Sequence, residues 1–171
     1  NIAFANRHVG DAASQAISIT NTNIAPGFQE SLKGAATLTG NATGGGSFAS
    51  VAAGSSGSVT AGINTSTAGA KSGSVNVALT SVGAGTSGLA DLSLGSQAIG
   101  VSGNVYRLAE VNTIAPVNFG NVLANTAQTR TITVSNLAAA DGFSEALNAA
   151  FGTIGGANAG SFATSGAING L

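Results

Sequence analysis

The residue pattern of this chain recurs after 115 positions, and this repeat limits the folds that the chain can adopt. When Phe4 is set against Phe119, nine further positions carry the same or a similar residue in both copies. The matched pairs are Asn6/Asn121, Ala12/Ala127, Ile17/Ile132, Ile19/Val134, Asn21/Asn136, Gly27/Gly142, Phe28/Phe143, Glu30/Glu145 and Leu32/Leu147. After a one-residue deletion, Ser47-Phe48-Ala49 also meets Ser161-Phe162-Ala163. A period this long exceeds the roughly 20–45 residues of a solenoid repeat and favours tandem domains of about 100 residues.

The expected fold is therefore all-β, with immunoglobulin-like antiparallel β-sandwich domains in tandem and an incomplete second copy. Residues 1–110 form the complete repeat, 111–115 a short linker, and 116–171 the N-terminal half of a second repeat. A sandwich that lacks its later strands exposes apolar faces and unpaired edges. Two interpretations stay open: the chain is one section of a longer protein, or strands from another chain complete the second repeat.

Short runs of alternating apolar and polar residues predict half-buried strands. Clusters of Gly, Asn and Ser separate these runs and indicate turns. About seven strands are expected in the first copy and three or four in the second. The clearest runs are 15–20, 58–63, 74–79, 98–101 with Val105, and 131–134. The best helical signal, residues 145–150 and their match 30–35, is also interpreted as strand because Gly34 disfavours a helix.

Charged residues are scarce, and this excludes several classes of partner. Lys and Arg total five, Asp and Glu total six, and the net charge is −1. Nucleic-acid binding needs clustered Lys and Arg, and calcium sites need several carboxylates. The chain has no Cys, which excludes disulfides and thiolate-bound metals. Because no apolar run reaches the roughly 18 residues of a membrane span, we expect no membrane span in this segment.

Two features that are typical of enzymes occur, and neither predicts a catalytic site. Residues 83–88 match G-x-G-x-x-G after a predicted strand, but the next residues do not form the helix that a dinucleotide site needs. They are interpreted as a loop. His8 is the only histidine, Leu123 takes its place in the second copy, and a triad or zinc site would depend on it alone. We expect no catalytic, cofactor-binding or metal-binding residues, no cofactor and no enzymatic activity.

Both copies keep the sequence Gly-Phe-x-Glu-x-Leu around Glu30 and Glu145. One interpretation makes each Glu part of an intramolecular Lys–Asn cross-link. Lys33, however, aligns with Asn148, and the second copy contains no Lys. The favoured interpretation is structural: Phe28 and Phe143 fill the inside of the sandwich, while the Glu side chain caps a turn or accepts backbone N–H groups.

The segments Val117-Asn118-Phe119-Gly120-Asn121-Val122 and Thr131-Ile132-Thr133-Val134-Ser135-Asn136 resemble the bacterial choice-of-anchor D repeats. Those repeats are relatives of the ASPM–SPD-2–Hydin type of immunoglobulin-like domain. They begin with a V-x-F-G-x-V strand, followed by a T/S-x-x-I-x-I-x-N strand. The first copy departs from this pattern at Ala5, where the motif has Gly. The resemblance implies a module of secreted or surface-anchored bacterial proteins and carries over no catalytic residue.

These observations lead to a non-enzymatic structural repeat of a bacterial extracellular or cell-surface fibre or stalk. Its expected partners are copies of itself or adjacent repeats, and strand exchange between subunits would polymerise it. The alternative is an adhesin or carbohydrate-binding module. Sugar recognition relies on exposed aromatic residues, whereas this chain has no Trp and one Tyr, Tyr106, in a predicted last strand. A glycan or host-surface ligand has no support in the sequence.

Overall fold

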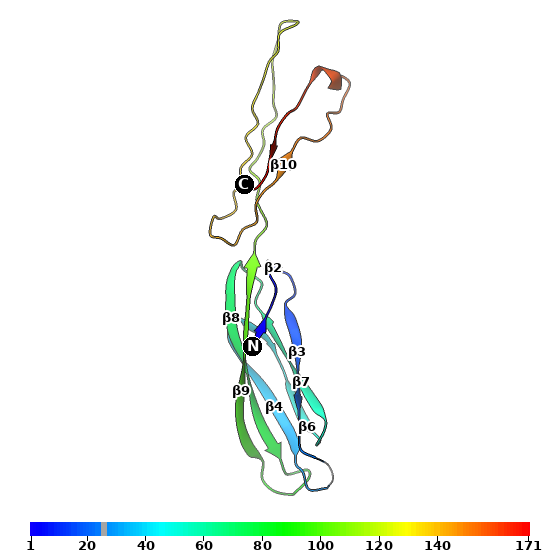
Figure 1. Ribbon diagram of the computed structural model, residues 1–171, viewed down its shortest axis with the longest axis vertical. Coiled ribbons are helices and arrows are strands. Elements are labelled where there is room, and N and C mark those ends of the chain that lie inside the picture. The colour runs from blue at the N-terminus through cyan, green and yellow to red at the C-terminus, as the bar shows by residue number, and fades with distance from the viewer. Residues whose placement is uncertain (25–26) are drawn as a thin grey trace. The chain divides into compact units, whose positions relative to one another are not determined.

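The computed structural model describes residues 1–24 and 27–171, and it is an all-β protein (Figure 1). No α-helix occurs in these ranges; the one helical element is a short 3₁₀ turn, η1 (Ala159–Ser161). The chain divides into two compact units, Asn1–Tyr106 and Arg107–Leu171, here called unit 1 and unit 2. The expected all-β class is thereby confirmed.

A six-stranded mixed sheet forms the larger part of unit 1 (Figure 1). Its long ladders, β4 with β6, β4 with β8 and β8 with β9, are antiparallel. The two short N-terminal strands both pair parallel to β9. The strands are β1 (Ile2–Ala3), β2 (Arg7–His8), β4 (Ser31–Gly40), β6 (Ser47–Val51), β8 (Gly69–Val82) and β9 (Leu92–Tyr106).

A second, antiparallel sheet contains β3 (Ser14–Thr20), β7 (Ser56–Ile63) and β5 (Ala42–Gly45), in the order β3-β7-β5. The chain passes from the first sheet to the second between β4 and β5. Gly40 makes this turn possible because its φ is +63°, and a Cβ there would lie 2.6 Å from the carbonyl oxygen of Ser72. Only glycine fits both conditions without strain.

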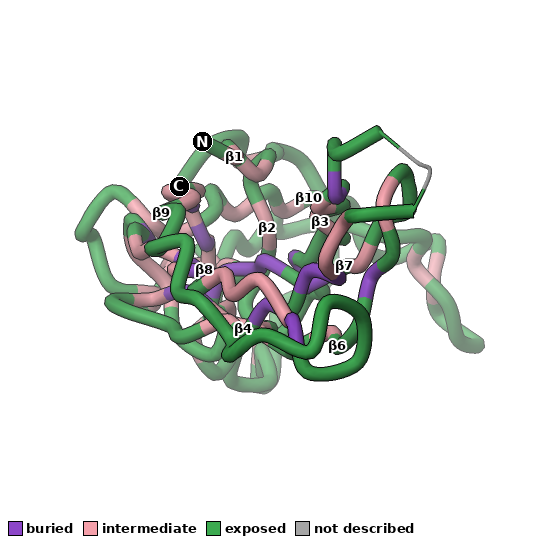
Figure 2. Tube along the Cα trace, turned by 90° about the horizontal axis from the view of Figure 1, so that it is seen from below, coloured by how far each residue is buried: buried purple, intermediate pink, exposed green. Residues whose placement is uncertain are grey.

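Side chains from both sheets of unit 1 form one hydrophobic core. Val75 and Val77 of β8 and Val105 of β9 are fully buried, and the alternating residues of β7 face them. The strand predictions for 15–20, 58–63, 74–79 and 98–101 are confirmed by β3, β7, β8 and β9. Among the described residues, the buried apolar side chains are Ala13, Leu32, Ala42, Val51, Val59, Ala61, Ile63, Val75, Val77, Val101 and Val105; Figure 2 draws buried residues in purple.

Unit 2 has no buried residue. Its only ladder joins two short antiparallel strands, β10 (Ala149–Ala150) and β11 (Ala167–Ile168). The three or four strands expected in the second copy are therefore not formed, and the predicted strand 131–134 has no ladder. The reason lies in unit 1, where the matching strand β3 pairs with β7. A β7 counterpart is missing from unit 2.

The β10–β11 ladder corrects the sequence alignment of the two copies. In unit 1, Gly34 pairs with Phe48 and Ala35 with Ser47. In unit 2, Ala149 pairs with Ile168 and Ala150 with Ala167. Ala149 and Ala150 match Gly34 and Ala35 at the 115-residue period, so β11 is the counterpart of β6. The expected match between Ser47-Phe48-Ala49 and Ser161-Phe162-Ala163 is wrong, because Ser161 belongs to η1, before β11.

The volume of the paired residues supports this correction. The ring of Phe48 lies so close to Gly34 and Gly57 that a Cβ at either glycine would overlap it. In unit 2 the glycine of β4 becomes Ala149, and the facing phenylalanine becomes the smaller Ile168. A gain of volume on one strand thus accompanies a loss on the other, as close packing requires.

Gly34→Ala in unit 1 is expected to lower the free energy of unfolding by about 1–3 kcal/mol, because the new methyl group overpacks against Phe48. In the double variant Gly34→Ala/Phe48→Ile, the loss of unfolding free energy should be smaller than the sum of the losses in the two single variants. The reason is that the Ala–Ile pair is the one found in unit 2. Urea denaturation of the four variants measures this coupling. Gly85→Ala, at an open position, is the matched control. Strictly additive losses would contradict the structural equivalence of β6 and β11.

Candidate functional site

The titratable residues considered in the sequence lie apart from one another. His8, on β2, lies beside a neighbour in sequence: its Nδ1 lies 3.8 Å from Oδ2 of Asp11, and its backbone N–H donates to the same oxygen. In the described ranges no group of three or more His, Asp or Glu side chains is placed to hold a metal ion. No helix in the same ranges is long and apolar enough to cross a membrane.

The carboxylate of Glu30 links β4 to the loop between β8 and β9. Ser87 donates a hydrogen bond to Oε1 at 2.5 Å, and Ser81 donates one to Oε2 at 2.7 Å. These hydroxyl groups, Ser87 above all, lower the pKa of Glu30 because they stabilise its charged form. The expectation that this side chain caps a turn or accepts backbone N–H groups is corrected, since its partners are hydroxyls from another part of the chain.

Residues 83–88, which match G-x-G-x-x-G, form a closed turn. The N–H groups of Thr86 and Gly88 both donate to the carbonyl of Gly83. No helix follows, because β9 begins at Leu92. The turn therefore lacks the helix N-terminus that a pyrophosphate site needs, in agreement with the sequence interpretation of a loop.

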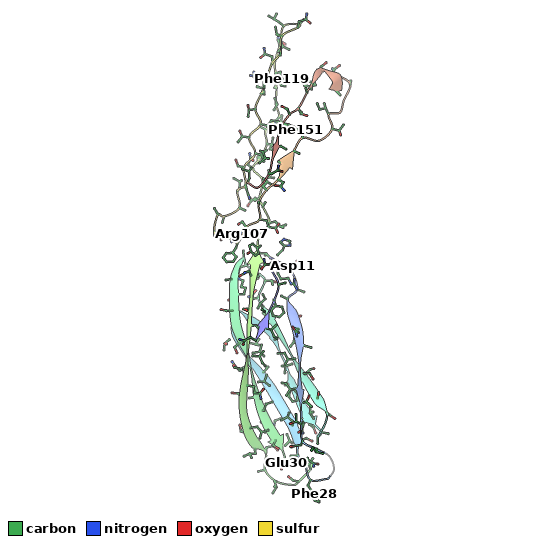
Figure 3. All side chains as sticks on the ribbon, viewed as in Figure 1. Asp11, Phe28, Glu30, Arg107, Phe119 and Phe151 are labelled. Carbon is green, nitrogen blue, oxygen red and sulfur yellow. The ribbon has the colours of Figure 1, made fainter. Side chains whose placement is uncertain are left out.

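Phe28 does not fill the inside of unit 1, as the sequence led us to expect. Its side chain is 100% exposed, and it lies at the same end of the unit as Glu30 (Figure 3). The position follows Gly27, whose φ of +99° turns the chain before β4 begins. Its match in unit 2, Phe143, is partly buried. The two phenylalanines are thus covered differently in the two units.

The lysines give no support to a cross-link with Glu30. Lys33 forms an ion pair with Asp91, with Nζ 3.5 Å from Oδ2. Lys71 is 7% exposed, and its ammonium group donates to the hydroxyl of Thr67 at 2.8 Å. Neither contact involves an Asn side chain.

The most specific polar arrangement in unit 1 is centred on Asn21, directly after β3. Its Nδ2 donates to the carbonyl oxygens of Glu30 and Val51, both at 3.1 Å. Its Oδ1 accepts the N–H of Asn23, and its backbone N–H donates to Ser55. One carboxamide, only 7% exposed, thereby ties the end of β3 to the start of β4 and the end of β6. We call this arrangement the Asn corner.

Unit 2 builds the same Asn corner around Asn136. Its Nδ2 donates to Glu145 at 3.0 Å and to Leu171 at 3.1 Å, and its Oδ1 accepts the N–H of Ala138. Glu145 and Ala138 match Glu30 and Asn23 at the 115-residue period. Leu171 takes the place of Val51, and it exchanges two backbone hydrogen bonds with Leu147, as the pairing of Leu32 with Val51 leads one to expect.

Sequence analysis matched Asn21 with Asn136 but assigned them no role. In both units the Asn side chain donates to the backbone carbonyl of the repeated Glu. The signal was present in the motif T/S-x-x-I-x-I-x-N, whose last residue is this Asn. An Asn that ends an alternating strand is well suited to bind backbone groups of neighbouring segments.

Unit 2 also presents an unusual share of large apolar side chains to solvent. Phe119 matches Phe4, which packs against the core of unit 1; in unit 2 its ring lies beside the ring of Phe162, at 6.1 Å between centroids. The exposed set comprises Leu108, Val111, Ile114, Val117, Val122, Leu123, Leu137, Phe151, Phe162 and Leu171. Exposed apolar surface of this kind marks an interaction surface.

Asn21→Asp is expected to lower the unfolding free energy of unit 1 by about 1–3 kcal/mol, because the change turns a donor facing two carbonyls into a third acceptor. Chemical denaturation monitored by amide signals of β3, β4 and β6 measures the loss. Asn23→Asp is the control, since only the backbone N–H of Asn23 takes part in the corner. Equal stability of the two variants would show that the corner does not stabilise the fold.

The exposed apolar side chains of unit 2 are thus the feature of this chain with the clearest capacity for interaction. No protein-family model, curated protein or solved structure matches the chain. The functional argument consequently depends on the geometry of its own residues.

Proposed function

We propose that this chain is a section of a tandem array of immunoglobulin-like β-sandwich units, in a non-enzymatic bacterial fibre or stalk outside the cell. The observation that carries the proposal is the Asn corner, which the chain builds twice from residues 115 positions apart. Two copies of one corner indicate two copies of one folding unit, of which the second is present in part.

The strand pairings of unit 1 support a shared architecture for unit 2. Strands β1, β2, β3, β4 and β5 all pair with β7, β8 or β9. The ladder between β4 and β6 is the one that joins two strands of the first half, and its counterpart β10–β11 is the ladder that unit 2 retains. Unit 2 therefore has the structure expected of the first half of unit 1 alone.

The residues of unit 2 that match β3 and β4 lack partner strands of the β7–β9 type. A further segment of that type supplies these partners. The 171 residues contain two first halves and one set of β7–β9, which unit 1 uses. If identical copies of this chain exchanged their β7–β9 segments, one first half in every chain would still lack its partner strands. We therefore favour completion by a further β7–β9 segment in a tandem array over closed exchange between identical subunits.

The phenylalanines of unit 2 favour this structural role over carbohydrate binding. Phe119 occupies the position of a residue that packs against the core in unit 1. In unit 2 it is only partly buried, as the lack of partner strands explains, and this does not by itself indicate a sugar platform.

The tandem array is tested by a chimera in which residues 52–106 follow Leu171, because Leu171 is the counterpart of Val51. We expect a second cooperative unfolding transition and slow amide exchange at Ile132 and Val134, whose N–H groups gain acceptors on a β7 partner. In the control chimera the added segment begins at Ser58, the junction that the sequence alignment implies. Absence of a second transition from the Ala52 chimera would count against two copies of one unit.

The cellular role is tested by electron microscopy of intact source cells labelled with an antibody raised against the chain. Label on fibres or stalks outside the cell is expected. Label confined to the cell interior would exclude the extracellular role while leaving the tandem architecture intact.

A further inference from the structure

β3 is an edge strand of the three-stranded sheet, and its outer side carries free backbone groups. The hydrogen bonds from Asn21 N–H to Ser55 and from Ile63 N–H to Ala13 fix which residues face β7. Because alternate residues of an antiparallel strand bond to opposite sides, the odd-numbered residues bond to β7 and the even-numbered ones point outward. Among the described residues, no partner lies on the backbone groups of Ser18, Thr20 and Thr22 at this edge.

In unit 2 the corresponding edge is occupied by the segment that follows β9. Asn112 meets it three times: its N–H donates to Ser135, its Nδ2 donates to Thr133, and its Oδ1 accepts the N–H of Ser135. The carbonyl of Glu110 accepts the N–H of Leu137 at 2.6 Å. At the 115-residue period the contacted residues are the counterparts of Ser18, Thr20 and Thr22. Four groups of the β3 edge thus have an occupied match in unit 2: the carbonyl of Ser18, the N–H and carbonyl of Thr20, and the N–H of Thr22.

The same segment extends this contact to the region of Phe143. The N–H of Arg107 donates to the carbonyl of Phe143, and its guanidinium group pairs with Asp141 at 2.8 Å. Arg107 and the N–H of Phe143 also lower the pKa of Asp141. Phe143 is partly buried, while its match Phe28, next to no such segment, is fully exposed. Residues 107–112, which span the end of the predicted first repeat and its linker, are therefore bonded within unit 2.

We propose that the outer edge of β3 accepts an extended segment of the 107–112 type, supplied by the end of a preceding unit in the same polypeptide. This inference rests on the proposed tandem array and adds how neighbouring units are joined. The segment that leaves one unit becomes the first strand of the next. Its Asn carboxamide bridges one N–H and one carbonyl of the edge, which fixes the register that a plain edge strand would leave open.

The test places a second copy of residues 107–115 directly before Asn1 of the full chain, which preserves the register found in unit 2. Backbone amide exchange of Thr20 and Thr22 is expected to slow by about tenfold or more, because both N–H groups gain acceptors. Phe28 should become less accessible to solvent. Amides of β7 and β8 serve as internal references for an intact fold.

Two grafts of equal length are the matched controls. One carries Pro at the grafted Asn112, which removes the backbone donor and the carboxamide together. The other is a Gly-Ser segment that supplies length without the side chains. Protection in the native-sequence graft alone supports the proposal. Unchanged exchange at Thr20 and Thr22 in a graft whose core amides stay protected would overturn it.

A second copy of the chain is the competing occupant. If the unmodified chain forms dimers and protects Thr22 as its concentration rises, residues 107–112 are donated between molecules and the tandem source is wrong. A failed graft would not change the result expected for the chimera in which residues 52–106 follow Leu171. That chimera completes unit 2 and leaves the β3 edge unchanged. The two proposals can therefore fail independently.

Discussion

The pairing of the first half of unit 1 with β7, β8 and β9 is the interaction on which its structure depends. Five of the six early strands obtain their ladder from one of these three strands. The same three strands supply seven of the nine residues of the central core cluster, including Val75, Val77 and Val105. The same long-range contacts thus pair the backbone N–H and C=O groups and bury the apolar side chains. Unit 2 has no ladder of this long-range kind, and none of its residues is buried.

The contacts present in unit 2 are counterparts of those that unit 1 makes within its first half, between β3, β4 and β6. The β10–β11 ladder and the corner around Asn136 both join segments that lie before the counterpart of β7. An isolated two-stranded ladder is marginal in water, so a carboxamide that is hydrogen-bonded to three segments adds contacts that the ladder alone lacks. In unit 1 Asn21 is almost fully buried. The corner therefore serves as a local scaffold in both units.

Sequence reasoning succeeded where short-range alternation decides the outcome and failed where a partner strand decides it. The runs around Ile17, Val59, Val75 and Ile99 alternate as half-buried strands do, and all lie in strands. The run around Ile132 alternates equally well but has no ladder, because alternation specifies a face and cannot supply a neighbour. The alignment of Phe48 with Phe162 followed residue identity, whereas strand register follows the loop length between β10 and β11. Phe28 is apolar and was therefore expected inside, whereas its side chain is fully exposed.

The proposed junction also explains why so weakly charged a chain could use strand edges safely. Exposed edges with few charges invite unspecific pairing between chains. An edge that requires an Asn carboxamide at one position, followed by a chain that continues into the next unit, accepts few other segments. The covalent connection raises the local concentration of the correct strand above that of any free competitor. In a tandem array, the preceding unit would cover the β3-type edge of each unit. The later strands of the same unit would pair with its first half. Only the ends of the array would then need another means of protection.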